Sequence, residues 1–313
     1  MKLKHLLLIP LLLLTSCHKE VDTSSLNIIS PTGAPAVCFY KEVLNPNFET
    51  NSKPKNIISM MTKESNKDIV IIDTVSGIKA INTGAPYLLA SNITFGNFYI
   101  ASTGNDEDKI MSQDDVIVLF GEKQTPDYIF HYIYGNEFDS TIEYVASAQD
   151  AAKCLVSGKN LITDSKVDYV FIAEPALSKV LNNKNAPTYG KSSVYINIQD
   201  EYKKKSNNLS LVQASVFVKN TSDRKLVDAY LDNLKDDINL AISSPEVVKD
   251  SLNQLSNEEA TSLFGINGDE AFQVISNNNA MGLGYIKAKE NKGAIDKFIS
   301  LFGMEQTNEE IYY

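Results

Sequence analysis

Four points in the sequence combine a turn with the beginning of a helix, and each offers hydrogen-bonding groups. They are the segments 30–35, 73–74, 124–126 and 174–175, three of which contain a hydroxyl side chain. The first turn of a helix carries backbone N–H groups without intrahelical partners, and such groups bind anions or other acceptors. We therefore interpret the four junctions, taken together, as the candidate binding groups of this protein.

The charge of a ligand at these junctions stays open from the sequence. Asp73, Asp127 and Glu174 lie at helix beginnings, where they would repel a strong anion or pair with a cationic or N–H-rich ligand. Helix capping also explains each junction taken singly, because Ser, Thr and Asp side chains satisfy the first N–H groups of a helix. Only the combination of junctions indicates a ligand site.

The composition leaves little room for catalysis or for a metal centre. The chain contains one Arg, Arg224, and three His residues, His5, His18 and His131. A site with several His ligands is therefore excluded beyond residue 18, and a Ser–His or Cys–His pair would have to use His131. Gly33 belongs to neither a dinucleotide fingerprint nor a phosphate loop. We expect no catalytic residue, no metal and no cofactor.

The overall composition is that of a folded protein with a sizeable core. The 313 residues are 43% hydrophobic and 22% charged, which suits two lobes of about 100–200 residues each. The formal net charge of −10 makes nucleic acid an unsuitable partner, since binding it requires a basic surface. We expect Cys38 and Cys154 to be buried free thiols in separate lobes, with a disulfide between them as the alternative.

The first residues have the pattern of an export signal. Lys2 and Lys4 precede an apolar run at 6–14 that is too short to span a bilayer. The run ends in LTSC at 14–17, which resembles the lipobox of bacterial lipoproteins. That resemblance implies a signal peptide at 1–16, a lipid-modified Cys17, a tether at 17–25 and a place on the outer face of a bacterial membrane. A plain secretory signal with an incidental Cys is the alternative.

The elements that would position the junctions alternate between strands and helices. Apolar runs at 26–29, 68–72, 116–120, 142–145 and 167–173 predict buried strands, and helical patterns follow most of them. Strands are also predicted at 87–94, 97–102 and 209–218, with helices dominating the remainder. Strand–turn–helix units of this kind favour parallel α/β sheets, whose ligands bind beyond the carboxyl ends of the strands.

Three of these motifs carry a family resemblance. SPTGAPA at 30–36, DIVIIDT at 68–74 and YVFIAEPAL at 169–177 resemble segments of ABC-importer substrate-binding proteins of the nitrate/sulfonate/thiamine-precursor type. The resemblance extends over about residues 26–303. It implies a type II periplasmic-binding-protein fold, with two α/β lobes joined by crossover strands near 97–104 and 209–216. Lobe 1 would comprise 26–102 plus 213–313, and lobe 2 would comprise 103–212.

The same resemblance implies a ligand site between the lobes. The residues that it places on the lobe 1 side are Ser30, Thr32, Gly33, Asp73 and Thr74. Those on the lobe 2 side are Gln124, Thr125 and Glu174, and Asn92 and Thr94 would lie near the crossover. No residue matches the Arg that clamps the carboxylate in amino-acid-binding relatives, which disfavours an α-amino acid as ligand.

The function implied is capture of a small molecule by a monomeric lipoprotein that delivers it to an ABC permease and its ATPase. Two alternatives remain open. One is a ligand-binding lipoprotein that serves a sensor, and the other is an enzyme on the same fold that uses His131 or Glu174 as a base.

Overall fold

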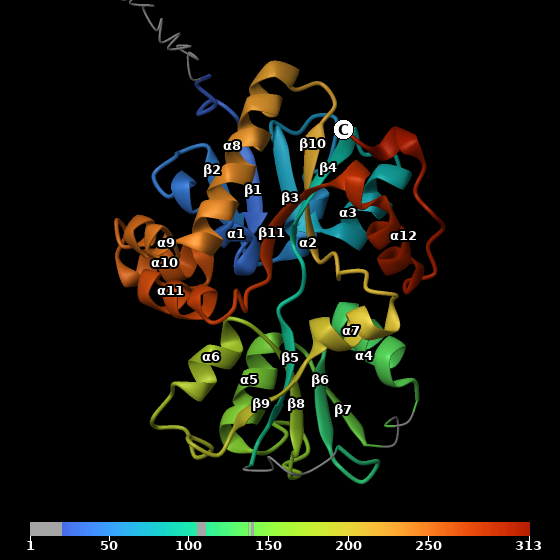
Figure 1. Cartoon of the computed structure of the whole chain (residues 1–313), viewed down its shortest axis with the longest axis vertical. Helices are drawn as coiled ribbons and strands as arrows, with labels where there is room; N and C mark the ends of the chain where they lie inside the picture. Colours follow the sequence, from blue (N-terminus) through green and yellow to red (C-terminus); the bar gives the residue numbers. More distant parts are fainter. Residues whose placement is uncertain (1–20, 105–110, 137, 139–140) are drawn as a thin grey trace, which may run out of the picture.

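The computed structural model describes residues 21–104, 111–136, 138 and 141–313. Two α/β lobes, each built around its own sheet, follow one another along the longest axis of the molecule (Figure 1). The expected signal peptide at 1–16 and Cys17 lie outside the described residues. Within the described ranges, no helix combines the length and the apolar character that crossing a bilayer requires.

Lobe 1 contains a six-stranded sheet in the order β11-β4-β10-β3-β1-β2. β1 is parallel to β2 and β3, and β10 is antiparallel to both β3 and β4. The runs at 26–29 and 68–72 thus form neighbouring parallel strands, as their continuous apolar character predicts. The strands of this sheet are β1 (Ile28–Pro31), β2 (Phe48–Asn51), β3 (Ile69–Asp73), β4 (Tyr87–Thr94), β10 (Ala214–Lys219) and β11 (Leu283–Lys287).

Helices cover the faces of this sheet (Figure 1). The longest is α8 (Arg224–Ser243), which buries an apolar stripe at helical spacing, Val227, Tyr230, Leu231, Leu234, Ile238 and Ala241. The other helices of lobe 1 are α1 (Ala34–Val37), α2 (Pro54–Ser59), α3 (Thr74–Asn82), α9 (Glu246–Leu252), α10 (Asn257–Phe264), α11 (Gly268–Ser276) and α12 (Lys292–Ser300), with short 3-10 turns η1 (Tyr40–Glu42), η2 (Ala288–Asn291) and η3 (Glu309–Ile311).

Lobe 2 contains a five-stranded sheet in the order β7-β6-β8-β5-β9. β6 is parallel to β7 and β8, whereas β5 is antiparallel to β8 and β9. Its strands are β5 (Phe98–Ser102), β6 (Ile117–Phe120), β7 (Ile142–Val145), β8 (Tyr169–Ala173) and β9 (Ser193–Asn197). Its helices are α4 (Thr125–Tyr134), α5 (Ala148–Ser157), α6 (Ala176–Leu181) and α7 (Ile198–Lys205).

The first boundary between the lobes differs from the expected one. Residues 98–102, which the sequence assigns to lobe 1, form β5 and pair with β8 and β9 of the lobe 2 sheet. The chain therefore crosses at 95–97, and it returns through 206–213 before β10. A strand on either side of the Gly96-Asn97 turn has the same apolar pattern, so the pattern alone does not reveal which sheet it joins.

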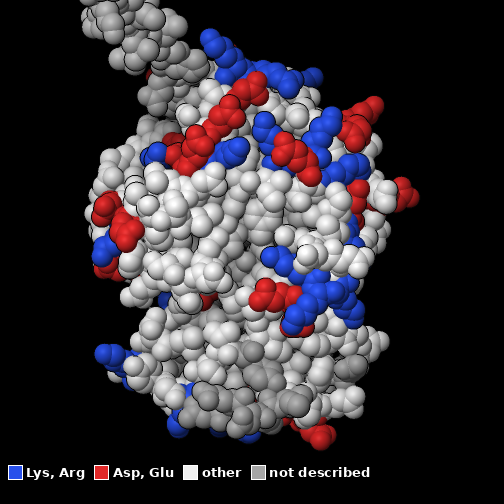
Figure 2. All heavy atoms as spheres, in the orientation of Figure 1, with Lys and Arg blue, Asp and Glu red and all other residues white. Residues whose placement is uncertain are grey.

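The two cysteines follow the prediction. Cys38 and Cys154 are both buried and free, the first in lobe 1 and the second on α5 of lobe 2. Burial raises the pKa of the Cys38 thiol, which keeps it protonated and unreactive. On the face shown in Figure 2, charged side chains gather at the top of lobe 1 and over α7, and uncharged residues cover most of the surface between them.

The packing of α3 on the sheet generates a test of the core. Gly77 lies in α3 so close to β10 that a methyl group there would overlap the ring of Phe217, which is fully buried. We expect Gly77→Ala to lower the free energy of unfolding by about 1–3 kcal/mol, because the ring has no free space to move into.

Gly293→Ala in α12 is the matched control, since nothing lies within 4 Å of its added methyl group. It should raise the free energy of unfolding by about 0.5–1 kcal/mol through helix propensity. Urea unfolding of both variants measures the difference, and equal midpoints would contradict the close packing of α3 against β10.

Candidate binding cleft between the lobes

The carboxyl ends of β1, β3 and β8 open onto one cavity of about 420 Å³, which we call the cleft. It is lined from lobe 1, from lobe 2 and from both crossing segments. Its lining residues are Pro31, Thr32, Gly33, Ala34, Pro35, Pro54, Ile72, Asp73, Asn97, Ala148, Gln149, Ala173, Glu174, Pro175, Ala176, Lys179, Gln213, Ala214 and Gly265. Most of these side chains are small and apolar, so a few polar groups decide what can bind.

The lobe 1 wall begins with the turn after β1. Gly33 has a φ of 102°, a conformation that glycine adopts without strain. Its N–H donates to the carbonyl of Phe264 at 3.1 Å, and Gly265 packs against the same backbone. The turn and the end of α10 are therefore fixed to each other at the edge of the cleft.

Asp73 ends β3 and begins α3. Its Oδ1 accepts from the N–H of Ser76 at 2.8 Å, as a helix cap, and burial raises the pKa of its carboxyl group. Beside it, Gln213 is held by its main chain, since the N–H of Thr74 donates to the Gln213 carbonyl at 3.0 Å. The Gln213 Oε1 atom is buried and has no hydrogen-bond partner in the described part of the chain.

Glu174 supplies the lobe 2 wall at the end of β8. Only 4% of the residue is exposed, and both carboxylate oxygens accept from Ser178, one from its N–H at 3.0 Å and one from its hydroxyl at 2.8 Å. Burial raises the pKa of this carboxyl group, and the bonds from Ser178 oppose that shift only in part. The peptide bond from Glu174 to Pro175 is cis.

Asn97 connects this wall to the first crossing. The Glu174 N–H donates to the Asn97 carbonyl at 2.9 Å, and the Asn97 Nδ2 donates to the Glu174 carbonyl at 2.5 Å. Asn97 is 5% exposed, and its Oδ1 has no hydrogen-bond partner among the described residues. Two residues of the cleft lining, Asn97 and Gln213, thus have a buried amide oxygen without a hydrogen-bond partner in the described part of the chain.

The lobes also contact each other beside the cleft. On the α6 side, Lys179 Nζ donates to the Gly265 carbonyl at 3.1 Å and lies 3.3 Å from a Glu270 carboxylate oxygen. On the α4 side, the rings of Tyr128 and Phe302 have centroids 4.8 Å apart. Figure 1 shows α6 beneath α11 on one side and α4 with α7 beneath α12 on the other.

The expected binding residues divide into two groups. Thr32, Gly33, Asp73 and Glu174 are brought together in the cleft lining. Gln124 and Thr125 begin α4, outside that lining. The remaining four, Ser30, Thr74, Asn92 and Thr94, are buried inside lobe 1.

Those four buried residues have internal partners. The Ser215 hydroxyl lies 2.6 Å from that of Thr74 and accepts from Asn92 Nδ2 at 2.8 Å, while Asn291 donates to Asn92 Oδ1 at 2.7 Å. Thr94 Oγ1 accepts from the N–H of Ala214 at 3.0 Å. The Ser30 hydroxyl donates to the carbonyl of Pro31 at 3.1 Å. These bonds hold β10 and the crossing in register.

Sequence reasoning missed several polar residues of the cleft, Asn97, Gln149, Lys179 and Gln213. Asn97 and Gln213 lie on crossing segments, which have no periodicity that would indicate the direction of a side chain. The Gly96-Asn97 turn was the only available signal. Gln149 and Lys179 reach the cleft because α5 and α6 begin there, which depends on tertiary packing.

His131 lies on α4 outside the lining, with its Nδ1 2.8 Å from an Asp127 carboxylate oxygen. In the parts of the chain that the structure describes, no group of three or more His, Cys, Asp or Glu residues could hold a metal ion.

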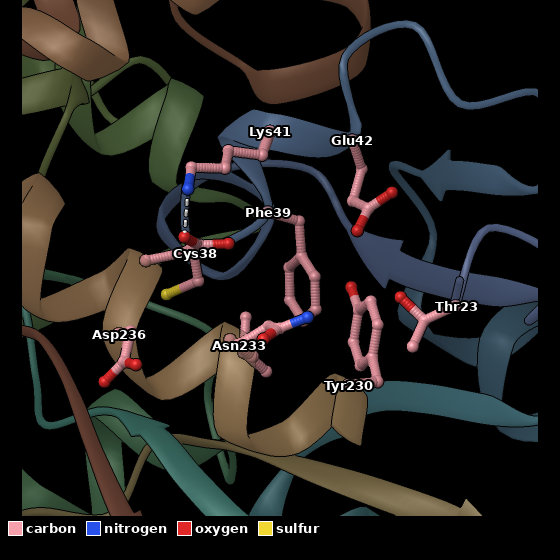
Figure 3. Close-up of a pocket in the computed structure, with 10 residues that line it drawn as sticks. Thr23, Cys38, Phe39, Lys41, Glu42, Tyr230, Asn233 and Asp236 are labelled. Atoms are coloured by element: carbon pink, nitrogen blue, oxygen red, sulfur yellow. Dashed lines mark ion pairs between the residues drawn. The ribbon is translucent and has the colours of Figure 1, made fainter. Parts of the chain in front are cut away.

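A second cavity of about 350 Å³ lies in lobe 1 between η1 and α8 (Figure 3). Lys41 and Asp237 form an ion pair across it, and Glu42 faces the hydroxyl of Tyr230. Burial and the neighbouring Glu42 carboxylate raise the pKa of Tyr230. Lys41 and Asp237 thus pair with each other within the same lobe, and the cavity lies away from the carboxyl ends of β1 and β3.

Comparisons with known proteins identify the fold. No protein-family model matches the chain, and no curated protein matches it. Solved structures do. The crystal structure of an ABC transporter from Parabacteroides distasonis has a TM-score of 0.69 and 18% identity, covering 93% of this chain and 99% of that chain.

Two further structures agree with it. The periplasmic aliphatic sulphonate binding protein SsuA from Escherichia coli has a TM-score of 0.61 and 13% identity, covering 89% of this chain and 91% of that chain. The ligand binding component of an ABC-type import system from Staphylococcus aureus, with zinc bound, has a TM-score of 0.60 and 9% identity. That match covers 92% of this chain and 95% of that chain. The predicted two-lobed type II periplasmic-binding-protein fold is confirmed.

The network around Ser215 generates a test of its structural role. Ser215→Ala would leave the buried Thr74 hydroxyl and Asn92 amide without their shared partner. We expect the free energy of unfolding to fall by about 1–3 kcal/mol, the usual effect of unsatisfied buried polar groups. Ser300→Ala, at an exposed position in α12, should change it by less than about 0.5 kcal/mol. Denaturant midpoints that agree between the two variants would contradict this role.

Proposed function

We propose that the chain is an extracytoplasmic substrate-binding protein, which captures a small molecule between its lobes and delivers it to an ABC importer. The observation that carries the proposal is the cleft, a cavity of about 420 Å³ lined by both lobes and both crossings. Ligands of open α/β sheets bind beyond the carboxyl ends of the strands, where this cavity lies. The fold shared with ABC-importer proteins supports the same role.

Capture in this proposal means closure of the lobes around the ligand. Asp73 comes from lobe 1 and Glu174 from lobe 2, so neither lobe could surround a ligand without the other. A molecule that contacts both walls binds the closed form more tightly and shifts the equilibrium toward it. Because one chain supplies both walls, the protein would act as a monomer.

The partners and location follow from the same proposal. The closed, loaded protein would dock on an ABC permease with its ATPase, as in importers of the nitrate/sulfonate/thiamine-precursor type. Lipid modification of Cys17 would hold it on the outer face of a bacterial membrane. Leu26 is the first buried residue of the described part, which suits residues 17–25 as a tether.

The alternatives make different use of the same fold. An enzyme would need a general base at the ligand, but His131 lies outside the cleft lining in contact with Asp127. A sensor would capture its ligand in the same way. Uptake of the ligand by cells, compared between strains with and without the gene, distinguishes transport from sensing.

Capture can be tested by native mass spectrometry of the full-length chain, released from mild detergent after gentle purification. We expect one small molecule per chain that dissociates on activation and raises the melting temperature when added back, because a ligand at 100 times its Kd stabilises by about 2.7 kcal/mol.

Ala176→Trp, which fills the cleft, should abolish both effects, whereas Ser243→Trp at an exposed position of α8 should keep them. An unliganded mass, together with a melting temperature that no compound of a broad metabolite panel changes, would count against capture.

Lipid attachment can be tested by labelling cells with a palmitate analogue. The chain contains three cysteines, and thioester or thioether attachment requires one of them. We expect Cys17→Ala to lose the label and to leave the membrane fraction, and Cys38→Ala and Cys154→Ala to keep both. A label that persists in Cys17→Ala would refute the lipoprotein assignment.

A further inference from the structure

The polar groups that reach the cleft are mainly hydrogen-bond acceptors. Four of the seven polar residues in the lining are Asp73 and Glu174, with carboxylates, and Asn97 and Gln213, with unpaired amide oxygens; the other three are Thr32, Gln149 and Lys179. Asp127, the third acidic residue at a helix beginning, lies outside the lining, with its carboxylate next to His131. The acceptors come from β3, from the end of β8 and from both crossings, so they surround the cavity.

The orientation of the Asn97 amide is fixed by its neighbour. Its Nδ2 donates to the Glu174 carbonyl at 2.5 Å, and a flipped amide would place two oxygens against each other. The Oδ1 atom must therefore stay on the other side, where it is buried and has no partner among the described residues. Gln213 Oε1 is in the same condition. Buried acceptors without a donor destabilise a protein unless a ligand or water supplies the donor.

Among the described residues, neither carboxylate is in ion-pair contact with a cationic side chain, although the charge of Lys79 acts on Asp73. Across the described ranges, no Lys, Arg or His nitrogen forms an ion pair with Asp73 or Glu174. Their hydrogen bonds come from the neutral groups of Ser76 and Ser178. Lys179 reaches the cleft, but its Nζ is bound to the Gly265 carbonyl and close to Glu270.

Donors for an anion are scarce by comparison. The helices that begin at the cleft after β1 and β8, α1 and α6, are only 4 and 6 residues long. The longer α5 also begins there, with Ser147 capping the N–H of Asp150. The beginning of α3 is already capped by Asp73. The one guanidinium, Arg224, lies on α8 with a 73% exposed side chain near Asp228. A sulfonate or nitrate ion would meet the carboxylates of Asp73 and Glu174, with Thr32, Gln149 and Lys179 as the remaining side-chain donors of the lining.

We infer that the ligand is a compact organic cation, whose charged nitrogen group donates hydrogen bonds to Asp73, Glu174 and the two amide oxygens. This inference rests on the proposed capture function. The volume of about 420 Å³ and the Pro, Ala and Ile side chains of the walls accommodate a small apolar body behind the charged group. Hydrogen bonds from every donor of the charged group to these acceptors offset the loss of its hydration, and the carboxylates repel anions.

The test uses probes of one shape and opposite charge, benzamidinium and benzoate, with benzenesulfonate as a third probe. We expect benzamidinium to raise the melting temperature of the full-length chain and to displace the molecule that copurifies with it. That molecule should carry a protonatable nitrogen. An acidic copurified molecule, or displacement by benzoate or benzenesulfonate, would overturn the inference and leave capture intact. If nothing copurifies and no probe changes the melting temperature, both the inference of a cationic ligand and the proposed capture function are contradicted.

Variants separate a binding role from a structural one. Glu174→Gln and Asp73→Asn should each weaken benzamidinium binding about tenfold or more, and Asn still caps α3. Glu122→Gln, whose side chain is 57% exposed, is the control and should not change it. Gln213→Leu should raise the melting temperature without ligand and also weaken binding. A rise in melting temperature with unchanged affinity would show that Gln213 is merely unsatisfied.

The direction in which the affinity changes with pH distinguishes a cationic ligand from an anionic one. Burial raises the pKa of both carboxyl groups in the unliganded protein, so a cation should bind more tightly as pH rises above 4.5, the ordinary pKa of Glu, and should release protons. The charged and titratable groups around the two carboxyl groups are Lys79, whose charge acts on Asp73, Lys179 of the lining, and Tyr99, whose pKa is raised to about 12 by burial and by the Glu174 charge. Affinity that falls with rising pH would indicate an anion held by protonated carboxyl groups.

Discussion

The structure depends on how the chain crosses between its lobes in only three residues, 95–97. The Phe95 N–H donates to the Gly282 carbonyl at 2.8 Å, and a side chain on Gly282 would overlap the Gly96 carbonyl. One residue later, Asn97 already bonds to Glu174 through its main chain and its side chain. The crossing is thus fixed to lobe 1 at one end and to the wall of the cleft at the other, so the proposed hinge and the proposed binding surface share the same residues.

The buried polar groups of the molecule fall into two clusters, one in which they have hydrogen-bond partners and one in which some do not. Inside lobe 1, Thr74, Asn92 and Ser215 are paired with one another, as buried polar groups usually are. At the cleft, Asn97 and Gln213 keep acceptors unpaired. The contrast between two polar clusters on the same strands, one complete and one incomplete, is the physical difference between a structural network and a binding surface.

The sequence predicts the strand–helix junctions well, because a buried strand followed by a cap has a local pattern. Asp73 and Glu174 reach the cleft for that reason. Thr74 and Asn92 do not, since a shift of one residue reverses the direction of a side chain on a strand and turns it by about 100° on a helix. The edge strands β2, β9 and β11 were missed because they are short and mixed in polarity, and the sheet that 98–102 joins depends on pairing rather than on pattern.

The contacts on the two sides of the cleft differ in the free energy that separating the lobes there would require. On the α4 side, aromatic rings from both lobes pack together, Tyr128 on Phe302 and Tyr202 on Phe298. On the α6 side, Lys179 and Glu270 are about one-third exposed, and such a pair contributes only about 0.2–1 kcal/mol. Opening on that side would also return the unpaired acceptors of Asn97 and Gln213 to water. If the protein captures a ligand as proposed, the lobes are therefore expected to separate on the α6 side.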